Sequence, residues 1–173
     1  SATGVDLASK CIDCIAGRYF TQAAQITNVC IQCVAGKYFT QAAQTADVCL
    51  TCPAGKSVEA TGSDQMTDCI ACATGRYSSA SDVTCIDCVA GRYSISVSPQ
   101  NDAVGDCIAC IAGKWSSTSA ADAATNCTDC AAGRWSSSIG ADTELTCINC
   151  VAGKYFNDTG QSNDVCISCV AGK

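Results

Sequence analysis

The chain has 173 residues, 18 of which are cysteine, and it contains no histidine. A net charge of −6 and a pI of about 4.3 argue against nucleic acid and anionic membranes as partners, and the missing histidines remove the commonest general base and zinc ligand. Leu, Ile, Val and Phe make up only about a sixth of the residues, too few to build an ordinary hydrophobic core.

All the cysteines fall into nine Cys-x-x-Cys pairs, spaced about 20 residues apart. Each pair is followed by one small or apolar residue, Ala or Thr, Gly, a basic residue and usually an aromatic, as in the segment that begins at Cys14. A fixed period of this size is typical of a repeat array in which each unit contacts mainly its neighbours. We therefore interpret residues 1–173 as one continuous array of about nine repeats of roughly 19–20 residues, with both ends cut within a repeat.

The fold class follows from the size and pattern of one repeat. A unit of about 20 residues is too small to fold unaided, so it needs covalent links. No window shows a sustained 3.6-residue apolar pattern, which predicts almost no helix. The glycine after each pair indicates a left-handed or crowded backbone position, and a second glycine suits a positive-φ turn at Gly62, Gly105, Gly140 and Gly160. The prediction is a small disulfide-rich repeat array, an elongated rod of short β-hairpins and turns.

Three other uses of the cysteine pairs compete with a disulfide ladder. A four-thiolate zinc site takes two pairs, and nine pairs leave one over. A redox-active pair normally sits at a helix N-terminus, whereas each of these pairs is followed by a small residue and glycine. Bridges within each pair remain an alternative, although they would cross-link almost nothing. We expect neither metal nor cofactor.

The favoured arrangement links the second cysteine of one pair to the first of the next. Each bridge then closes a loop of 12 to 18 residues, and a loop near 15 residues contributes about 3 kcal/mol. The predicted bridges are Cys14–Cys30, Cys33–Cys49, Cys52–Cys69, Cys72–Cys85, Cys88–Cys107, Cys110–Cys127, Cys130–Cys147 and Cys150–Cys166. This leaves Cys11 and Cys169 without a partner inside the ladder.

The segment Cys-x-Ala-Gly-[Lys/Arg]-Tyr, with another cysteine about a dozen residues later, resembles the ephrin-receptor-like cysteine-rich repeat. It is also similar to the first loop of tumour-necrosis-factor-receptor modules. The resemblance covers essentially the whole chain and implies the same disulfide pairing. Tandem arrays of this type occur in large surface proteins of algae and other protists. The chain departs from the receptor modules in lacking cysteines for their additional crossed disulfides.

The basic residues form a second periodic feature, because all except Lys10 follow the repeated glycine. They are Arg18, Lys37, Lys56, Arg76, Arg92, Lys114, Arg134, Lys154 and Lys173. With the aromatics that follow seven of them, they could form stacking platforms for a polyanion or a sugar. We favour a structural interpretation, in which each aromatic lies on a disulfide and each basic residue pairs with a nearby Asp, because the repeat has nothing else large to bury.

The density of cysteine indicates an oxidising compartment, and we expect an extracellular or cell-surface protein. Asn126 and Asn157 each begin an N-glycosylation sequon, and Asn126 is the weaker candidate because the neighbouring Cys127 should be bridged. The Ser/Thr-rich stretches offer sites for O-linked glycans, although solvated loops explain them equally well. No run is long enough to insert in a membrane, and no signal peptide begins at Ser1, so we expect a mature piece of a larger product.

No nucleophile–base pair, phosphate-binding loop or carboxylate cluster is recognisable, so we expect no enzyme activity. The favoured function is that of a structural protein of an extracellular filament, appendage or surface stalk. The alternative is a ligand-binding, cysteine-rich ectodomain stalk of a surface receptor or surface antigen. The near-identity of the repeats favours the structural function, since a binding site usually needs one or two divergent units.

The two ends of the sequence fit together in phase. If Lys173 is followed by Ser1 of another copy, 14 residues separate Cys169 from the next Cys11, which is within the range of the internal loops. We therefore expect copies to run head to tail with a bridge between Cys169 and Cys11, either as separate chains or within one long chain. Such a contact does not close on itself and produces a filament.

Overall fold

The structure is a computed structural model that describes residues 13–21, 30–97 and 99–170. Within these residues it contains eight two-stranded antiparallel sheets, each a hairpin of two-residue strands. The hairpins are β1 (Arg18–Tyr19) with β2 (Ile31–Gln32), β3 (Lys37–Tyr38) with β4 (Leu50–Thr51), β5 (Lys56–Ser57) with β6 (Ile70–Ala71), β7 (Arg76–Tyr77) with β8 (Ile86–Asp87), β9 (Arg92–Tyr93) with β10 (Ile108–Ala109), β11 (Lys114–Trp115) with β12 (Thr128–Asp129), β13 (Arg134–Trp135) with β14 (Ile148–Asn149), and β15 (Lys154–Tyr155) with β16 (Ile167–Ser168).

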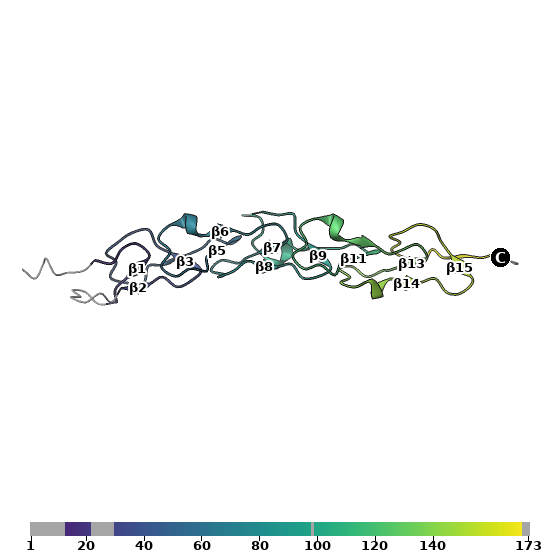
Figure 1. The fold of residues 1–173 in the computed structure, drawn as a ribbon, viewed down its shortest axis with the longest axis horizontal. Helices are drawn as coiled ribbons and strands as arrows, with labels where there is room; N and C mark the ends of the chain where they lie inside the picture. The colour runs from purple at the N-terminus through teal and green to yellow at the C-terminus, as the bar shows by residue number, and fades with distance from the viewer. Residues whose placement is uncertain (1–12, 22–29, 98, 171–173) are drawn as a thin grey trace, which may run out of the picture. The chain divides into compact units, whose positions relative to one another are not determined.

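Helix is confined, in the described part of the chain, to single 3₁₀ turns. These are η2 (Met66–Asp68), η3 (Val104–Asp106), η4 (Ala124–Asn126) and η5 (Glu144–Thr146). The predicted small disulfide-rich array of short hairpins and turns, with almost no helix, is therefore confirmed. The residues group into two compact units, Ser1–Ala71 with Ser78–Cys85, and Cys72–Tyr77 with Ile86–Lys173. Within each unit the hairpins follow one another in chain order (Figure 1).

A tight turn explains the segment that follows each cysteine pair. The Arg18 N–H donates to the Ile15 carbonyl at 3.2 Å, which closes a β-turn with Gly17 at its third position. Gly17 has φ +76°, a value that favours glycine. The turn delivers the basic and aromatic residues directly into the first strand of the hairpin.

The two residues inside the next Cys-x-x-Cys pair form the second strand. Ile31 lies opposite Tyr19 and Gln32 lies opposite Arg18, and the Cys33 N–H donates to the Gly17 carbonyl at 2.9 Å. The first cysteine of the pair therefore closes one loop, and the second cysteine opens the next. This division explains why the pairs have two intervening residues: they form a strand just long enough to complete one hairpin.

Main-chain hydrogen bonds attach each loop to the loop before it. In the second unit, the Gly113 N–H donates to the Ser136 carbonyl at 2.8 Å, and the Ser116 N–H donates to the Ala141 carbonyl at 3.0 Å. A third bond runs in the opposite direction, from the Gly140 N–H to the Cys110 carbonyl at 2.7 Å. The first unit repeats this set with the Gly36, Phe39 and Gly62 amides as donors to Val58, Ser63 and Cys33.

Contacts also reach the second neighbour, which the sequence interpretation did not expect. A Cβ added to Gly91 would overlap the carbonyl oxygen of Gly140, which belongs to the loop two repeats further on. Gly17 meets Gly62 in the same way in the first unit. The hydrogen bonds between loops join immediate neighbours, as expected, and the turn glycine additionally lets a later loop pack directly on its backbone.

A second left-handed position lies in the middle of most loops. It is occupied by glycine at Gly62, Gly140 and Gly160, but by Ala43, Ser81 and Ala120 elsewhere, with φ between 53° and 75°. The prediction of positive φ is thus correct for three of the four second glycines and wrong for Gly105. Gly105 is the middle residue of η3, and residues of a 3₁₀ turn have negative φ.

In the longest loop, between Cys88 and Cys107, a side chain takes the place of the backbone N–H that elsewhere bonds a cysteine carbonyl of the preceding loop. Asn101 is fully buried, and its Nδ2 donates to the carbonyls of Cys72 at 3.0 Å and Arg76 at 3.1 Å. In most other loops, the carbonyl equivalent to that of Cys72 accepts from a backbone N–H, as Cys88 does from Ala120. The amide group therefore preserves the contact between loops where additional residues displace the backbone.

The buried residues are mainly cysteine and serine, and most aliphatic side chains of the described residues are exposed. A representative cluster consists of Cys52, Val58 and Cys69, with Tyr38 packed against it. Aspartates secure the loop ends: Asp68 Oδ2 accepts from the Gln65 N–H at 3.1 Å, three residues earlier, and Asp82 and Asp106 do the same. Asp47 and Asp164 instead accept from the N–H of the cysteine two residues later. Disulfides and backbone contacts replace the core of a conventional domain.

Candidate functional site

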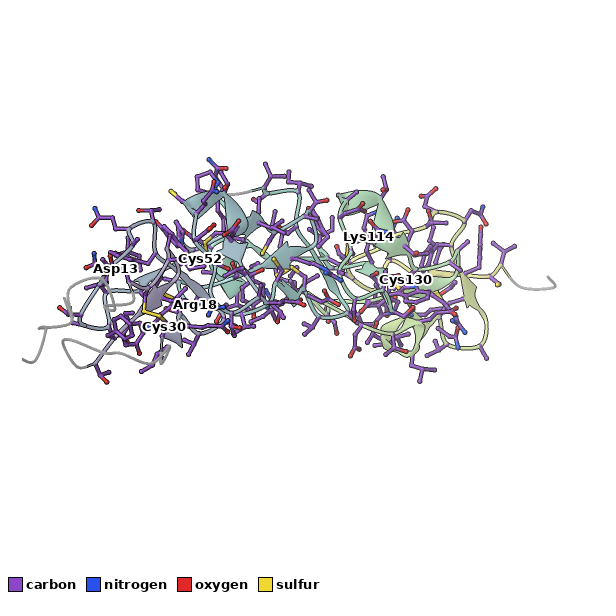
Figure 2. All side chains as sticks on the ribbon, turned by 60° about the vertical axis from the view of Figure 1, so that its left-hand side comes forward. Asp13, Arg18, Cys30, Cys52, Lys114 and Cys130 are labelled. Carbon is purple, nitrogen blue, oxygen red and sulfur yellow. A yellow bond between two sulfur atoms is a disulfide. The ribbon has the colours of Figure 1, made fainter. Side chains whose placement is uncertain are left out.

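The disulfides link successive repeats of the array, and each described bridge joins the second cysteine of one pair to the first cysteine of the next. The bridges are Cys14–Cys30, Cys33–Cys49, Cys52–Cys69, Cys88–Cys107, Cys110–Cys127, Cys130–Cys147 and Cys150–Cys166. Cys72 and Cys85 are also disulfide-bonded. Figure 2 shows the Cys30 bridge beside Arg18 of β1, where the hairpin begins. Each hairpin is thus closed at the point where its second strand starts.

Cys169 is one of the two cysteines that the predicted ladder leaves over. Cys169 is unpaired and exposed, and it follows β16 directly. Its N–H donates to the Gly153 carbonyl at 2.8 Å, as the second cysteine of the earlier pairs does. Cys11 lies outside the described residues. Cys169 therefore occupies the position from which a further loop would start.

The basic residues are held by the second strand of their own hairpin. Arg76 pairs with Asp87 at 2.8 Å and Lys114 pairs with Asp129 at 2.6 Å, and in both hairpins the two residues are directly opposite each other. Lys114 lies close to the start of the next loop at Cys130 (Figure 2). The predicted pairing with Asp is confirmed for these two residues.

Other basic residues use different acceptors. Arg134 donates to Asn149 Oδ1 and to Glu144 Oε1, both at 2.7 Å, and Arg92 donates to the Cys107 carbonyl at 2.9 Å. The charges of Arg76, Lys114 and Arg134 are therefore largely neutralised within the repeats. This arrangement favours the structural interpretation of the basic–aromatic segments over a binding platform for polyanions.

The aromatic residues that follow the basic residues are the largest side chains of the repeat, and most of them are partly buried. Tyr38 packs against the cluster that contains the Cys52–Cys69 bridge, as the structural interpretation expects. The other aromatics of the first strands are half-buried, except that Tyr155 is 48% exposed. Tyr155 belongs to the last hairpin of the described chain, so no later loop covers it there.

The two glycosylation sequons lie in different surroundings. Asn126 is half-buried at the end of η4, and its Oδ1 accepts from the Ala123 N–H at 3.1 Å. It thus replaces the aspartate that caps the equivalent turn at Asp106, and its neighbour Cys127 is bridged to Cys110. Asn157 is exposed, directly after the buried Phe156. The geometry favours Asn157 as the more accessible acceptor.

Exposed apolar residues recur at fixed positions of the repeat, which the sequence interpretation did not anticipate. They lie in two positions of the repeat, inside the cysteine pair and directly after it, and are between 41% and 70% exposed. They are Ile15, Ile31, Val34, Leu50, Ile70, Ile86, Val89, Ile108, Ile111, Ile148, Val151, Ile167 and Val170. Their β-branched or aliphatic character at a fixed phase of the repeat was the signal that could have identified them.

The described residues contain no group of three or more His, Cys, Asp or Glu side chains arranged to hold a metal ion. Nor does that part of the chain include a helix that is long and apolar enough to span a membrane. No protein-family model matches the chain, and no curated protein matches its sequence. The disulfide-rich repeats indicate an extracellular structural or ectodomain protein.

Proposed function

We propose that the chain is a structural protein of an extracellular filament, appendage or surface stalk. Its repeats are similar to ephrin-receptor-like cysteine-rich modules, and its role is mechanical and non-catalytic. Copies join head to tail through a disulfide between Cys169 of one copy and Cys11 of the next. The array then continues across each junction in the phase of the internal repeats.

The repeated main-chain bonding between loops is the observation that supports this function. The Gly113, Ser116 and Gly140 amides bond adjacent loops in a set that recurs at several steps of the second unit. Main-chain contacts do not depend on particular side chains, so the same step can be added without a natural limit. The exposed thiol of Cys169 stands where the next loop would begin.

Assembly of the purified 173-residue chain tests the proposal. The chain is produced in an oxidising host and analysed by non-reducing electrophoresis and electron microscopy. We expect a series of disulfide-linked multimers and fibres, with Cys11 joined to Cys169 in peptide maps. A matched Cys169→Ser variant should give no covalent multimers. A wild-type chain that stays monomeric, with the Cys169 thiol open to alkylation, would contradict the proposal.

Glycans are further expected partners of the surface. We propose N-linked glycans at Asn157 and, with lower occupancy, at Asn126, because Asn157 is exposed whereas Asn126 is half-buried. Mass spectrometry of chain from a glycosylating host, before and after amidase treatment, measures both occupancies. Higher occupancy at Asn126 than at Asn157 would contradict the accessibility argument.

A ligand-binding ectodomain stalk is the second candidate, and the exposed apolar residues favour it. Exposed apolar side chains commonly mark a protein-binding face where they gather. Exchanging Val89 and Ile111, both 65% exposed, for Thr should not affect head-to-tail assembly in a structural filament. It should abolish capture of a specific surface ligand if the array serves as a receptor stalk.

A further inference from the structure

The C-terminal part of the second unit carries a docking face of the same kind that the internal repeats cover. Inside the unit, Gly91 and Gly113 are buried, and each supports the backbone of a loop two repeats later, at Gly140 and Gly160 respectively. Gly133 and Gly153 have the same left-handed conformation, with φ +76° and +84°. In the described structure, however, nothing lies within 4 Å of a Cβ built on either glycine.

Main-chain groups at this face also lack the partners of their internal counterparts. The Cys110 carbonyl accepts from Gly140, and the Cys130 carbonyl accepts from Gly160. Among the described residues, the equivalent Cys150 carbonyl receives no such bond, and the Gly153 and Phe156 amides have no acceptor. The face therefore presents two bare glycines, one free acceptor and two free donors in the geometry that binds a loop elsewhere in the chain.

We propose that this face binds the segment Ser1–Cys11 of a second copy, an inference that rests on the head-to-tail function proposed above. The backbone donor lies ten residues after the cysteine that opens its loop at Gly62, Gly140 and Gly160, and the residue ten positions after Cys169 in a head-to-tail array is Asp6 of the second copy. In this arrangement the Asp6 N–H of the second copy donates to the Cys150 carbonyl. The backbone of Asp6 packs on Gly133, as Gly140 packs on Gly91.

Charge complementarity at the junction points to the same occupant. Asp13 is exposed and occupies the second position inside its cysteine pair, the position of Asp87 and Asp129. Those two aspartates pair with the basic residue of the preceding repeat, Arg76 and Lys114. The repeat that would precede Asp13 in a head-to-tail array ends in Lys173 of the other copy. Lys173 therefore supplies the cation that Asp13 is placed to receive.

The test separates docking from disulfide formation by using a Cys11→Ser/Cys169→Ser chain. Its self-association is measured by sedimentation equilibrium. Into this chain we introduce Gly133→Asn, because Asn tolerates positive φ but adds a Cβ where the second copy should pack. The matched control is Gly140→Asn, at a positive-φ position where a Cβ makes only ordinary contacts and where other loops carry Ala or Ser.

We expect the double-serine chain to associate, and Gly133→Asn to weaken association by about tenfold or more while Gly140→Asn leaves it unchanged. Thermal unfolding of both variants checks that they fold. Asp13→Lys should weaken association by about twofold to fivefold, and adding Lys173→Glu should restore it.

Three outcomes would overturn the proposal. Equal association of Gly133→Asn and Gly140→Asn would show that the next copy does not pack on Gly133, while leaving the filament function intact. Disulfide-linked fibres from the wild-type chain without any association of the double-serine chain would show that the bridge alone carries the junction. Absence of assembly in the wild-type chain would overturn the proposed function and this docking face together.

Discussion

The turn glycine satisfies two requirements at once, and Gly91 shows both. Its φ of +79° is a conformation that L side chains adopt only at a cost. Its missing Cβ also leaves room for the carbonyl of Gly140, two repeats away. Gly105 has neither property, because it lies in η3 with nothing within 4 Å of a built Cβ. The two glycines therefore form a matched pair for measuring what the repeated motif contributes.

Gly91→Ala should lower the free energy of unfolding by about 2–5 kcal/mol, the sum of left-handed strain and overpacking. Gly105→Ala should change it by less than about 1 kcal/mol. Chemical unfolding of the oxidised chains, followed by circular dichroism, gives both values. Similar small effects of the two substitutions would mean that the second-neighbour contact is not formed.

Ala120 presents the opposite case, since a non-glycine residue has φ +53°. Ala120→Gly should raise the free energy of unfolding by about 0.5–1 kcal/mol, because relief of about 1–2 kcal/mol of strain exceeds the additional backbone entropy of glycine. The adjacent Ala121 is buried, and Ala121→Gly should instead destabilise the chain. A lower unfolding midpoint for Ala120→Gly than for wild type would refute the strain argument.

Asn101 depends on the two hydrogens of its amide, which bond the Cys72 and Arg76 carbonyls. Asn101→Asp places a buried carboxylate against two carbonyl oxygens, and we expect a loss of about 3 kcal/mol or more at neutral pH. The exposed Asn157→Asp variant, in chain made without glycans, is the control and should be nearly neutral. Comparable unfolding midpoints for the two variants would show that the long loop is held by other contacts.

At the scale of the element, each hairpin consists of only two residue pairs, far fewer than an isolated hairpin needs. Three further contributions stabilise it: the turn at the glycine, the disulfide at the start of the second strand, and the hydrogen bonds to the neighbouring loop. In the β11–β12 hairpin, the ion pair between Lys114 and Asp129 adds a fourth. The Cys110–Cys127 bridge closes the loop that contains β11, so its removal should release that element first.

Replacing Cys110 and Cys127 together by Ser should lower stability by about 3 kcal/mol, because the open loop gains conformational freedom in the unfolded chain. Limited proteolysis should detect new cleavage between the two positions. The unpaired Cys169 supplies the control, and Cys169→Ser should leave the cleavage pattern unchanged. Protection of the loop in the double variant would mean that stacking, and not the bridge, holds it.

At the scale of the whole molecule, burial is dominated by disulfide sulfur and small side chains. Phe20, Val58 and Phe156 are the large aliphatic or aromatic residues that are buried in the described chain. So little apolar surface cannot offset the conformational entropy of 173 residues without cross-links. The order of both units should therefore depend on the oxidised state.

Full reduction should convert the chain to an expanded coil, with a large rise in the radius of gyration measured by small-angle scattering. Circular dichroism should lose any cooperative thermal transition under the same conditions. Heating of the oxidised chain serves as the reference. A cooperative transition that survives complete reduction would reveal a core that the burial pattern does not contain.

The sequence by itself determined the local features of this protein: the repeat, the hairpins, the turn glycine and the pairing of successive cysteines. These follow from interactions within about 20 residues, and spacing along the chain reports such interactions directly. The hairpin pairing of Arg76 with Asp87 belongs to the same class, because both residues lie in one short loop.

The tertiary structure alone decided how loops pack on one another. Neither the approach of Gly140 to Gly91 nor the left-handed φ of Ala120 is encoded in a local pattern, since both arise from contacts between separate repeats. The role of Asn101 was hidden for the same reason: an amide in a polar loop looks solvated until the carbonyls of Cys72 and Arg76 are brought to it. Periodicity specifies what one repeat forms, whereas the geometry of stacking determines which of its backbone groups a later repeat must satisfy.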